Sequence, residues 1–265
     1  VCDTHDNLLF FTDRGRVYHL RAYDVPDTKK QAKGLPIVNL IEMEPGERVT
    51  AILPVRSYDR DFILLTTRQG QIKKTRLAEF EEVRRNGKIA MRLDEGDQLI
   101  AARMASNDTH VILVSSEGQA IRFKIDDLRD ASRTSGGVRG IKLPDEGYVV
   151  GVETADDGDQ LLIISERGYG KRTALSEYPL QGRGGMGVKA LNITEKTGKV
   201  AACRVIRKGQ ELMLVTRDGI VMRTGLDRIS QLGRNTQGVK VMDVSPEDQV
   251  ASIAAFTMQD EPRRS

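Results

Sequence analysis

Tryptophan is absent from the 265-residue sequence, aromatic residues make up only 5% of it, and there are only two cysteines, Cys2 and Cys203. The cysteines are far apart and form no CxxC pair, which excludes a disulfide framework and indicates a reducing compartment. No apolar run approaches the ~18 residues of a membrane-spanning helix, and no signal-peptide pattern opens the sequence. We therefore expect a soluble, cytoplasmic protein with no membrane partner.

Residue patterns that form catalytic or metal sites are also missing. His5, His19 and His110 have neither metal-type spacing nor a consistent place in the sequence pattern, so we interpret them as ordinary surface or strand residues. No GxSxG, Walker A, HExxH or zinc motif occurs. The sequence therefore predicts no catalytic residue, no metal and no cofactor in this chain.

The hydrophobic content of 39% is low for one large packed core. It suits a fold that divides its core among small repeated units. The chain is long enough for one large domain or two small ones. It begins without Met, at a polar lead-in to a strand, and we interpret it as an excised part of a longer protein.

Three kinds of residue recur at a period of about fifty positions. A glycine follows a polar turn in each unit, a second glycine opens a later strand 17 to 19 residues further on, and an apolar residue lies between them. Such regular self-similarity indicates a repeat architecture. The first glycines are Gly15, Gly70, Gly118, Gly168 and Gly219; the second are Gly34, Gly87, Gly137, Gly187 and Gly238; the apolar residues are Tyr23, Phe80, Leu128, Tyr178 and Ile229.

Each unit predicts four strands. A β-rich run such as 161–165 and an alternating run such as 220–224 form a hairpin. A loop of about a dozen residues then carries the apolar residue, expected to act as a plug. A glycine-led third strand, as in the segment after Gly34, and a fourth, such as 48–53, complete the unit.

Four strands in about fifty residues predict an all-β, propeller-like fold of about five repeats in a single domain, residues 1–256. A helical solenoid is the rival fold, but it needs apolar residues at three- and four-residue spacing, which the sequence lacks. The tail, 257–265, matches no repeat and is expected to be mobile. The predicted repeats are 1–55, 56–105, 106–155, 156–206 and 207–256.

Basic residues favour the second hairpin strand and the loop after it, whereas acidic residues gather at other joints, such as 94–97 and 156–159. If the units form a ring, the basic groups line one rim, as in polyanion-binding proteins. Because the loops contain glycine and few aromatic residues, contact with the phosphates of duplex DNA is favoured over base stacking. The candidate DNA-binding residues are Lys29, Lys30, Lys33, Lys73, Lys74, Arg84, Arg85, Lys88, Arg122, Lys124, Arg133, Arg139, Lys171, Arg172, Arg183, Lys189, Arg223, Arg234 and Lys240.

One loop in the fourth unit is especially rich in glycine. Glycine has no Cβ, so such a loop can bring backbone N–H groups close to a phosphate. A flexible surface loop is the alternative interpretation. The heptad consists of Gln181, Gly182, Arg183, Gly184, Gly185, Met186 and Gly187.

The motifs GYGKRT at 168–173, PIVNL at 36–40 and GRNTQGV at 233–239, set in the repeated frame, resemble the C-terminal domain of the DNA gyrase A subunit. The resemblance covers essentially the whole chain, and the related topoisomerase IV subunit is the near relative. It implies a β-pinwheel, a propeller-like ring whose blades exchange strands, with six blades of which five are visible here. It further implies a bacterial, nucleoid-associated domain that wraps duplex DNA around a basic rim. With the rest of gyrase A and with gyrase B, this domain would support ATP-dependent negative supercoiling.

The sequence departs from that family in one respect. The family's box, QRRGGKG, normally belongs to the first blade, whereas the box-like heptad here lies in the fourth unit. Gly182 and Met186 stand where the family has basic residues. Either the first blade has been cut away, or the heptad is a second, degenerate box. The family's catalytic tyrosine belongs to another domain.

Two further functions remain as alternatives. One is a propeller that serves as a protein-interaction platform and docks an acidic partner, although the low aromatic content argues against it. The other is the equivalent DNA-binding domain of topoisomerase IV. A propeller enzyme would need a polar central site, which the sequence does not locate.

Overall fold

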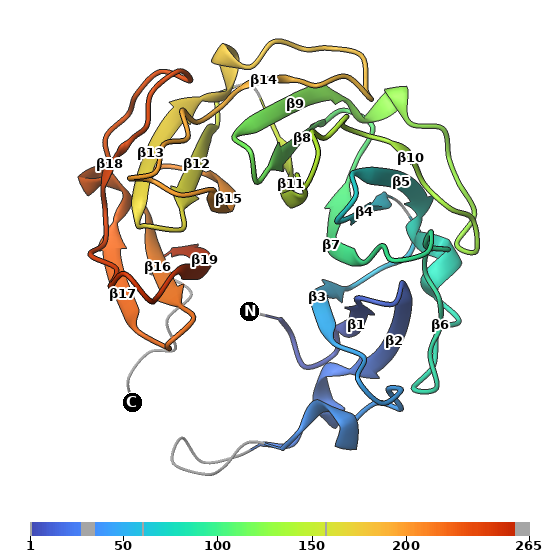
Figure 1. The fold of residues 1–265 in the computed structure, drawn as a ribbon. Coiled ribbons are helices and arrows are strands. Elements are labelled where there is room, and N and C mark those ends of the chain that lie inside the picture. The colour runs from blue at the N-terminus through green and yellow to red at the C-terminus, as the bar shows by residue number, and fades with distance from the viewer. Residues whose placement is uncertain (1, 28–34, 60, 157, 258–265) are drawn as a thin grey trace. The chain divides into compact units, whose positions relative to one another are not determined.

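The computed structural model describes residues 2–27, 35–59, 61–156 and 158–257 (Figure 1). These residues form strands and short 3-10 turns and contain no α-helix, which confirms the predicted all-β class. Lys29, Lys30, Lys33 and all of the predicted tail except Thr257 lie outside the described residues. The 3-10 turns are η1 (Ala22–Asp24), η2 (Ile37–Asn39), η3 (Leu77–Phe80), η4 (Ile125–Asp127), η5 (Leu175–Glu177) and η6 (Leu226–Arg228).

Every repeat begins with an antiparallel hairpin, as predicted, and ends with a longer strand that pairs with the first strand of that hairpin. The hairpins are β1 (Asn7–Thr12) with β2 (Arg16–Arg21), β4 (Phe62–Thr67) with β5 (Gln71–Arg76), β8 (His110–Ser115) with β9 (Gln119–Lys124), β12 (Gln160–Ser165) with β13 (Tyr169–Ala174), and β16 (Gln210–Thr216) with β17 (Val221–Gly225). The longer strands are β3 (Val49–Val55), β7 (Leu99–Ala105), β11 (Val149–Ala155), β15 (Val200–Ile206) and β19 (Val250–Thr257).

The repeat pattern predicted that each glycine-led strand completes its own unit, and this prediction is wrong. The exchange of strands between blades that the resemblance implied is confirmed. The glycine-led strands are β6 (Lys88–Ile89), β10 (Val138–Arg139), β14 (Val188–Lys189) and β18 (Val239–Lys240), and each pairs with the second hairpin strand of the preceding repeat. Four sheets therefore have four strands, in orders such as β3-β1-β2-β6, with the last strand donated by the next repeat. The fifth sheet, β17-β16-β19, has three, because the described residues include no later repeat.

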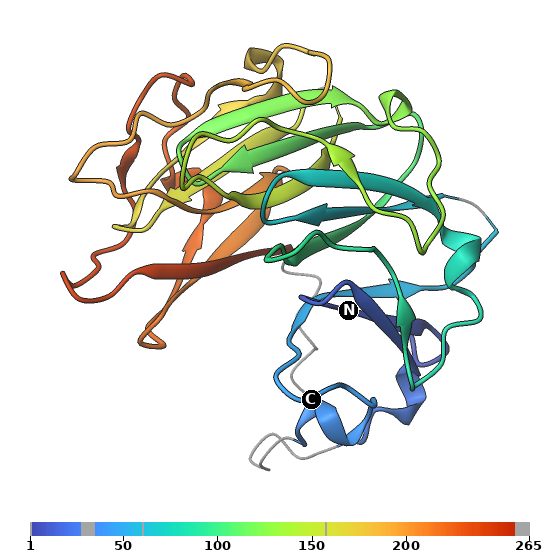
Figure 2. The same cartoon turned by 45° about the vertical axis from the view of Figure 1, so that its right-hand side comes forward.

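The chain divides into two compact units. The first consists of residues 1–107 with 128–139 and holds the first two sheets, and the second consists of 108–127 with 140–265 and holds the other three. Within the first unit, β6 lies beside β2 and β10 lies beside β5 (Figure 1). Figure 2 shows the same strands from a second direction. Strand donation thus assigns part of the third repeat, 128–139, to the first unit.

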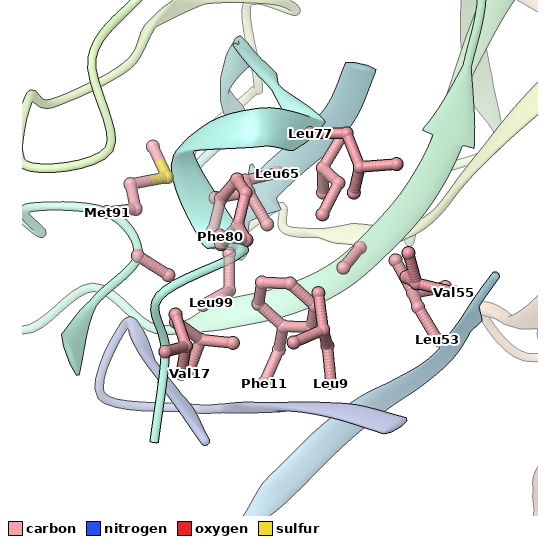
Figure 3. Close-up of a cluster of buried hydrophobic side chains, with 14 residues drawn as sticks. Leu9, Phe11, Val17, Leu53, Val55, Leu65, Leu77, Phe80, Met91 and Leu99 are labelled. Carbon is pink, nitrogen blue, oxygen red and sulfur yellow. The ribbon is translucent and has the colours of Figure 1, made fainter. Parts of the chain in front are cut away.

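The plug residues explain the core of each unit. Phe80 is completely buried and packs against Leu9, Phe11 and Val17 of the preceding hairpin (Figure 3). Tyr178 and Ile229 occupy the same place in the second unit. Each of these three plugs therefore removes apolar surface of two neighbouring repeats from water, which is the main stabilising contribution expected of a small divided core.

The first repeat departs from the predicted pattern at two places. Tyr23, predicted to be a plug, is 61% exposed, and the predicted strand after Gly34 is instead the 3-10 turn η2. Plugs and donated strands pack on the hairpin of the preceding repeat, and the described residues include no repeat before the one that contains Tyr23. Pro36, which has no N–H to donate, also weakens a strand here.

The landmark positions require glycine for a steric reason. Gly168 has φ +80°, and a Cβ on it would lie 2.2 Å from the carbonyl oxygen of Met242, in the chain that follows the donated strand β18. The Gly168 carbonyl accepts bonds from the N–H groups of Val241 and Met242, at 2.8 and 3.2 Å. Gly187 has φ +74°, and a Cβ on it would likewise lie 2.2 Å from the Ala120 carbonyl oxygen. Both glycines are therefore needed where a donated strand meets the preceding hairpin.

Candidate nucleic-acid interface

Four loops connect the plugs to the donated strands, and each lies along the second hairpin strand of the preceding repeat. We call them crossover loops: 81–87, 130–137, 180–187 and 231–238. The last three form short parallel bridges to β5, β9 and β13, for example between Lys74 and Asp130. The N–H groups of Ala131 and Leu232 donate to the carbonyls of Lys74 and Arg172, at 2.8 and 2.9 Å. The crossover loops thus cover one edge of each preceding hairpin.

Exposed basic side chains recur on the crossover loops and on the donated strands. Arg139, Lys189 and Lys240 occupy the same position, two residues after the second landmark glycine, and all three are exposed. Arg84, Arg85 and Arg183 are exposed on the loops themselves, and Lys88 is half-buried. Each unit therefore carries positive charge at repeated positions, as a polyanion-binding surface requires.

Arg133 and Arg234 are equivalent and are less exposed than the other loop arginines. The Arg234 guanidinium donates to the Lys189 carbonyl at 2.9 Å, and its main-chain N–H donates to the Glu177 carboxylate at 3.2 Å. Arg133 makes the same two contacts, with the Ile89 carbonyl and with Glu79. Each arginine thus links its crossover loop to the donated strand of the preceding repeat, β6 or β14. Part of each arginine side chain stays accessible.

Four of the candidate DNA-binding residues are buried. Lys73, Lys74, Arg122 and Lys171 are at most 4% exposed. The sequence alternation predicted strands with one exposed face, but the crossover loop of the next repeat covers that face. These strands are therefore buried on both sides, and the four cations cannot reach a ligand in this structure.

The buried cations contact protein groups. Lys74 forms an ion pair with Asp130 at 3.3 Å and lies 4.6 Å from the Phe62 ring centroid. The Arg122 guanidinium donates to the carbonyls of Leu175 and Tyr178, at 3.1 and 3.3 Å. Ion pairs and hydrogen bonds of this kind offset the free-energy cost of removing the charged groups from water.

Burial also changes the acidity of two lysines. Removal from water lowers the pKa of Lys73 to about 8 and that of Lys171 to about 8, because desolvation penalises the charged ammonium. Both ammonium groups donate only to atoms of crossover loops.

The remaining three candidates differ in exposure and in their protein contacts. Arg172 is half-buried and donates to the Ile229 carbonyl at 2.7 Å and to Gln160 at 3.1 Å. Arg223 is exposed but pairs with Glu211. Lys124 is exposed at the end of β9. Of these three, only Lys124 has an exposed side chain without a hydrogen bond or ion pair to a described residue.

The glycine-rich heptad is an exposed loop held by main-chain bonds. Gly184 donates its N–H to the Gly140 carbonyl at 2.7 Å, and the Gly185 carbonyl accepts from the Lys142 N–H at 2.8 Å. Open space surrounds Gly182, and Met186 is 56% exposed. The Gly184 N–H is therefore engaged by protein, while Arg183 extends the basic surface.

Two basic residues beside the loops escaped the sequence prediction. Arg92 and Lys142 are exposed and lie five residues after the second landmark glycines of their repeats. Their main-chain N–H groups donate to the crossover-loop carbonyls of Ser135 and Gly185, at 3.0 and 2.8 Å. Their shared position in the repeat was the signal that could have identified them.

Two acidic joints have a structural role. Asp97 is buried and accepts the N–H groups of Gln69 and Gln98, at 3.0 and 2.8 Å, so it fastens a hairpin turn to the strand beside it. Asp248 repeats this arrangement in the fifth sheet. These carboxylates satisfy turn N–H groups that burial would otherwise leave unpaired.

The structure gives His19 a protein partner and shows no metal site at the histidines in the part of the chain that it describes. His19 contacts Asn7 at 2.7 Å, and burial lowers the pKa of its imidazole. Across the described ranges, no group of three or more His, Cys, Asp or Glu side chains has the geometry of a metal site. No helix in these ranges is long and apolar enough to span a membrane.

A family profile matches most of the chain. The profile of the DNA gyrase C-terminal domain, beta-propeller, matches in five successive segments, at residues 6–56, 61–106, 109–156, 159–207 and 210–257. The matched segments together include every strand described above.

Curated relatives extend this similarity. The DNA gyrase A subunit of Staphylococcus epidermidis is 38% identical over 262 residues, which cover 97% of this chain and 29% of the relative. The same subunit of Ureaplasma parvum is 39% identical over 256 residues, covering 97% of this chain and 30% of the relative. The chain thus spans about three-tenths of the length of these relatives.

Two solved structures are similar to this chain in fold. The structure of a DNA gyrase A C-terminal domain superposes with a TM-score of 0.83 at 28% identity and covers 96% of this chain and 83% of its own. The C-terminal domain of a DNA topoisomerase IV has a TM-score of 0.88 at 22% identity, covering 97% and 81%, which shows a shared fold. The predicted resemblance is confirmed, and the chain belongs to the DNA gyrase C-terminal domain family.

Proposed function

We propose that this chain is the DNA-binding part of a DNA gyrase A protein, without catalytic activity of its own, and that it bends and wraps duplex DNA along its basic side chains. In the holoenzyme, with the rest of gyrase A and with gyrase B, it supports ATP-dependent negative supercoiling in the cytoplasm, at the nucleoid. The observation that carries the proposal is the recurrence of exposed Arg and Lys at equivalent positions of the donated strands and crossover loops.

The chemistry of these positions suits phosphate contact. Arg139, Lys189 and Lys240 project from equivalent strands, so successive repeats offer cations to successive stretches of a DNA backbone. Among the described residues there is no recognition helix, so binding should tolerate changes of base sequence. Bending a site of 20–30 bp costs about 1–6 kcal/mol, which contacts spread over several repeats would offset.

The test is the salt dependence of duplex binding, measured by fluorescence anisotropy over a range of salt concentrations. Substituting Arg84→Ala or Arg183→Ala should lower the slope of log affinity against log salt by about one each. The matched control is Arg48→Ala, because Arg48 is exposed beside β3, at the opposite edge of its sheet from β6. Its slope should equal that of the unchanged chain.

A slope near zero for the unchanged chain would contradict the proposal and favour a platform for an acidic protein. Wrapping needs a separate measurement, the linking number of nicked circles sealed by ligase in the presence of the chain. A shift that grows with protein concentration is expected. No shift with retained binding would reduce the proposal to binding and bending.

A further inference from the structure

Lys73 and Lys171 occupy equivalent positions in β5 and β13, and both are enclosed by main-chain carbonyls. The Lys73 ammonium donates to three carbonyls of the crossover loop 130–137. The N···O distances are 2.9 Å to Ser132, 2.8 Å to Arg133 and 3.0 Å to Ser135. All three protons of the ammonium are used, so the buried charge is fully hydrogen-bonded.

Lys171 repeats this arrangement in the second unit. Its ammonium donates to three carbonyls of the crossover loop 231–238 and to one hydroxyl. The carbonyl distances are 2.7 Å to Gly233, 2.6 Å to Arg234 and 3.0 Å to Thr236, and the Thr236 hydroxyl lies at 3.1 Å.

The two sets of carbonyls match position by position. In both loops they belong to the residues five, four and two places before the second landmark glycine, Gly137 or Gly238. In both, the middle carbonyl belongs to the loop arginine, Arg133 or Arg234, whose guanidinium reaches the preceding donated strand. The same residue type thus fastens the same loop atoms in two different units.

We propose that Lys73 and Lys171 are positioning residues: each ammonium holds the crossover loop of the next repeat in one conformation and thereby places Arg133 or Arg234 for contact with a phosphate. The contact with DNA rests on the function proposed above, whereas the fixing of the loop does not. A loop ordered before binding loses less conformational entropy when it binds.

β9 provides a natural contrast. Its equivalent residue is Ile121, which is completely buried and has no ammonium to donate, and the loop over it is the heptad 181–187. A Cβ on Gly185 would lie 3.8 Å from the Ile121 side chain, so the loop does pass over it. The most glycine-rich crossover loop therefore has no lysine beneath it. The loop 81–87 has none either, because β2 has Tyr18 at the equivalent position.

The first experiment measures amide hydrogen exchange without DNA in the variants Lys73→Met and Lys171→Met. Methionine keeps most of the length of the side chain and removes its charge. Exchange should quicken in residues 132–137 for the first variant and in 233–238 for the second. In each variant the other loop and the hairpin β8–β9 are internal controls. Unchanged exchange in the affected loop, with the hairpins still protected, would overturn the proposal.

The second experiment measures duplex binding against salt. Lys73→Met and Lys171→Met should weaken binding by a few fold and leave the salt slope unchanged, because these lysines are buried and touch no phosphate. Arg133→Ala and Arg234→Ala should each lower the slope by about one. A drop of about one for the lysine variants would show direct contact and overturn the positioning role. If the unchanged chain binds no DNA, the proposed function fails, while hydrogen exchange still decides whether the lysines fix the loops.

A reciprocal variant covers the case in which a methionine variant does not fold. Ile121→Lys places an ammonium beneath the heptad, where the carbonyls of Gly182, Arg183 and Gly185 have the matching sequence positions. Exchange in residues 182–186 should slow by several fold relative to the unchanged chain, and Ile121→Met is the uncharged control. Equal exchange in the lysine and methionine variants would contradict the proposal.

Discussion

Phe80 packs edge-on against Phe11, with ring centroids 5.8 Å apart and ring planes at 66°, although the two residues belong to different repeats. Phe80 comes from the loop of the second repeat and Phe11 from the first strand of the first. The same relationship between a plug and the preceding hairpin recurs at Tyr178 and Ile229. The repeats that Phe80, Tyr178 and Ile229 connect are therefore joined both by a donated strand and by a shared core.

Removing the plug should destabilise the first unit. Phe80→Ala deletes a fully buried ring and should lower the free energy of unfolding by about 3–5 kcal/mol. Tyr23→Ala is the control, because Tyr23 occupies the same sequence position in its repeat but is 61% exposed. Its effect should stay within about 0.5 kcal/mol. Urea unfolding of both variants, followed by circular dichroism, gives the comparison, and equal losses would contradict the role of the plug.

The landmark glycines differ in what surrounds them, which predicts different costs for alanine. Gly219→Ala places a side chain at φ +84° with no atom within 4 Å of the new Cβ, so only the backbone strain of about 1–2 kcal/mol applies. Gly168→Ala adds a contact of 2.2 Å with the Met242 carbonyl, so its loss of stability should be clearly larger. Thermal unfolding of the two variants tests this, and similar midpoints would show that the donated strand can move aside freely.

The lowered lysine pKa values predict a particular dependence of stability on pH. Between pH 8 and 10.5, folded chains release the Lys73 proton while unfolded chains, with the ordinary pKa of 10.5, retain it. The unfolded state then binds more protons, so this group makes the free energy of unfolding rise with pH across that window and leaves it flat below pH 8. The difference between the unchanged chain and Lys73→Met should therefore increase from about pH 8 upward. A difference that is constant with pH would contradict the lowered pKa.

A fourth prediction concerns the heptad. Gly182→Arg and Met186→Lys each add a cation to an exposed loop, at the two places where the resemblance showed basic residues missing. Each should raise the salt slope of duplex binding by about one and change the free energy of unfolding by less than about 0.5 kcal/mol. Ser252→Arg adds the same charge to the exposed part of β19, away from any crossover loop, and is the control. Equal gains in all three variants would indicate a general effect of net charge.

Local sequence patterns were sufficient for the strands and the repeat. Alternating side chains in runs such as 220–224 specify a hairpin strand, because a pleated strand has a period of two. The glycine spacing identified each turn and each donated strand from the second repeat onward, since steric demands at Gly168 and Gly187 leave no room for a Cβ. The sequence by itself thus determined the all-β class, the hairpins and the period of about fifty residues.

Tertiary structure decided which sheet each short strand joins and which cations are accessible. Lys73 looked like a surface residue because alternation describes one strand alone, whereas the first loop carbonyl that binds its ammonium belongs to Ser132, 59 residues later. Tyr23 looked like Phe80, yet the described residues include no hairpin of an earlier repeat for it to pack against. Burial depends on partners that are distant in sequence, and for this reason only the folded chain separates the lysines that fasten loops from the arginines and lysines that remain exposed.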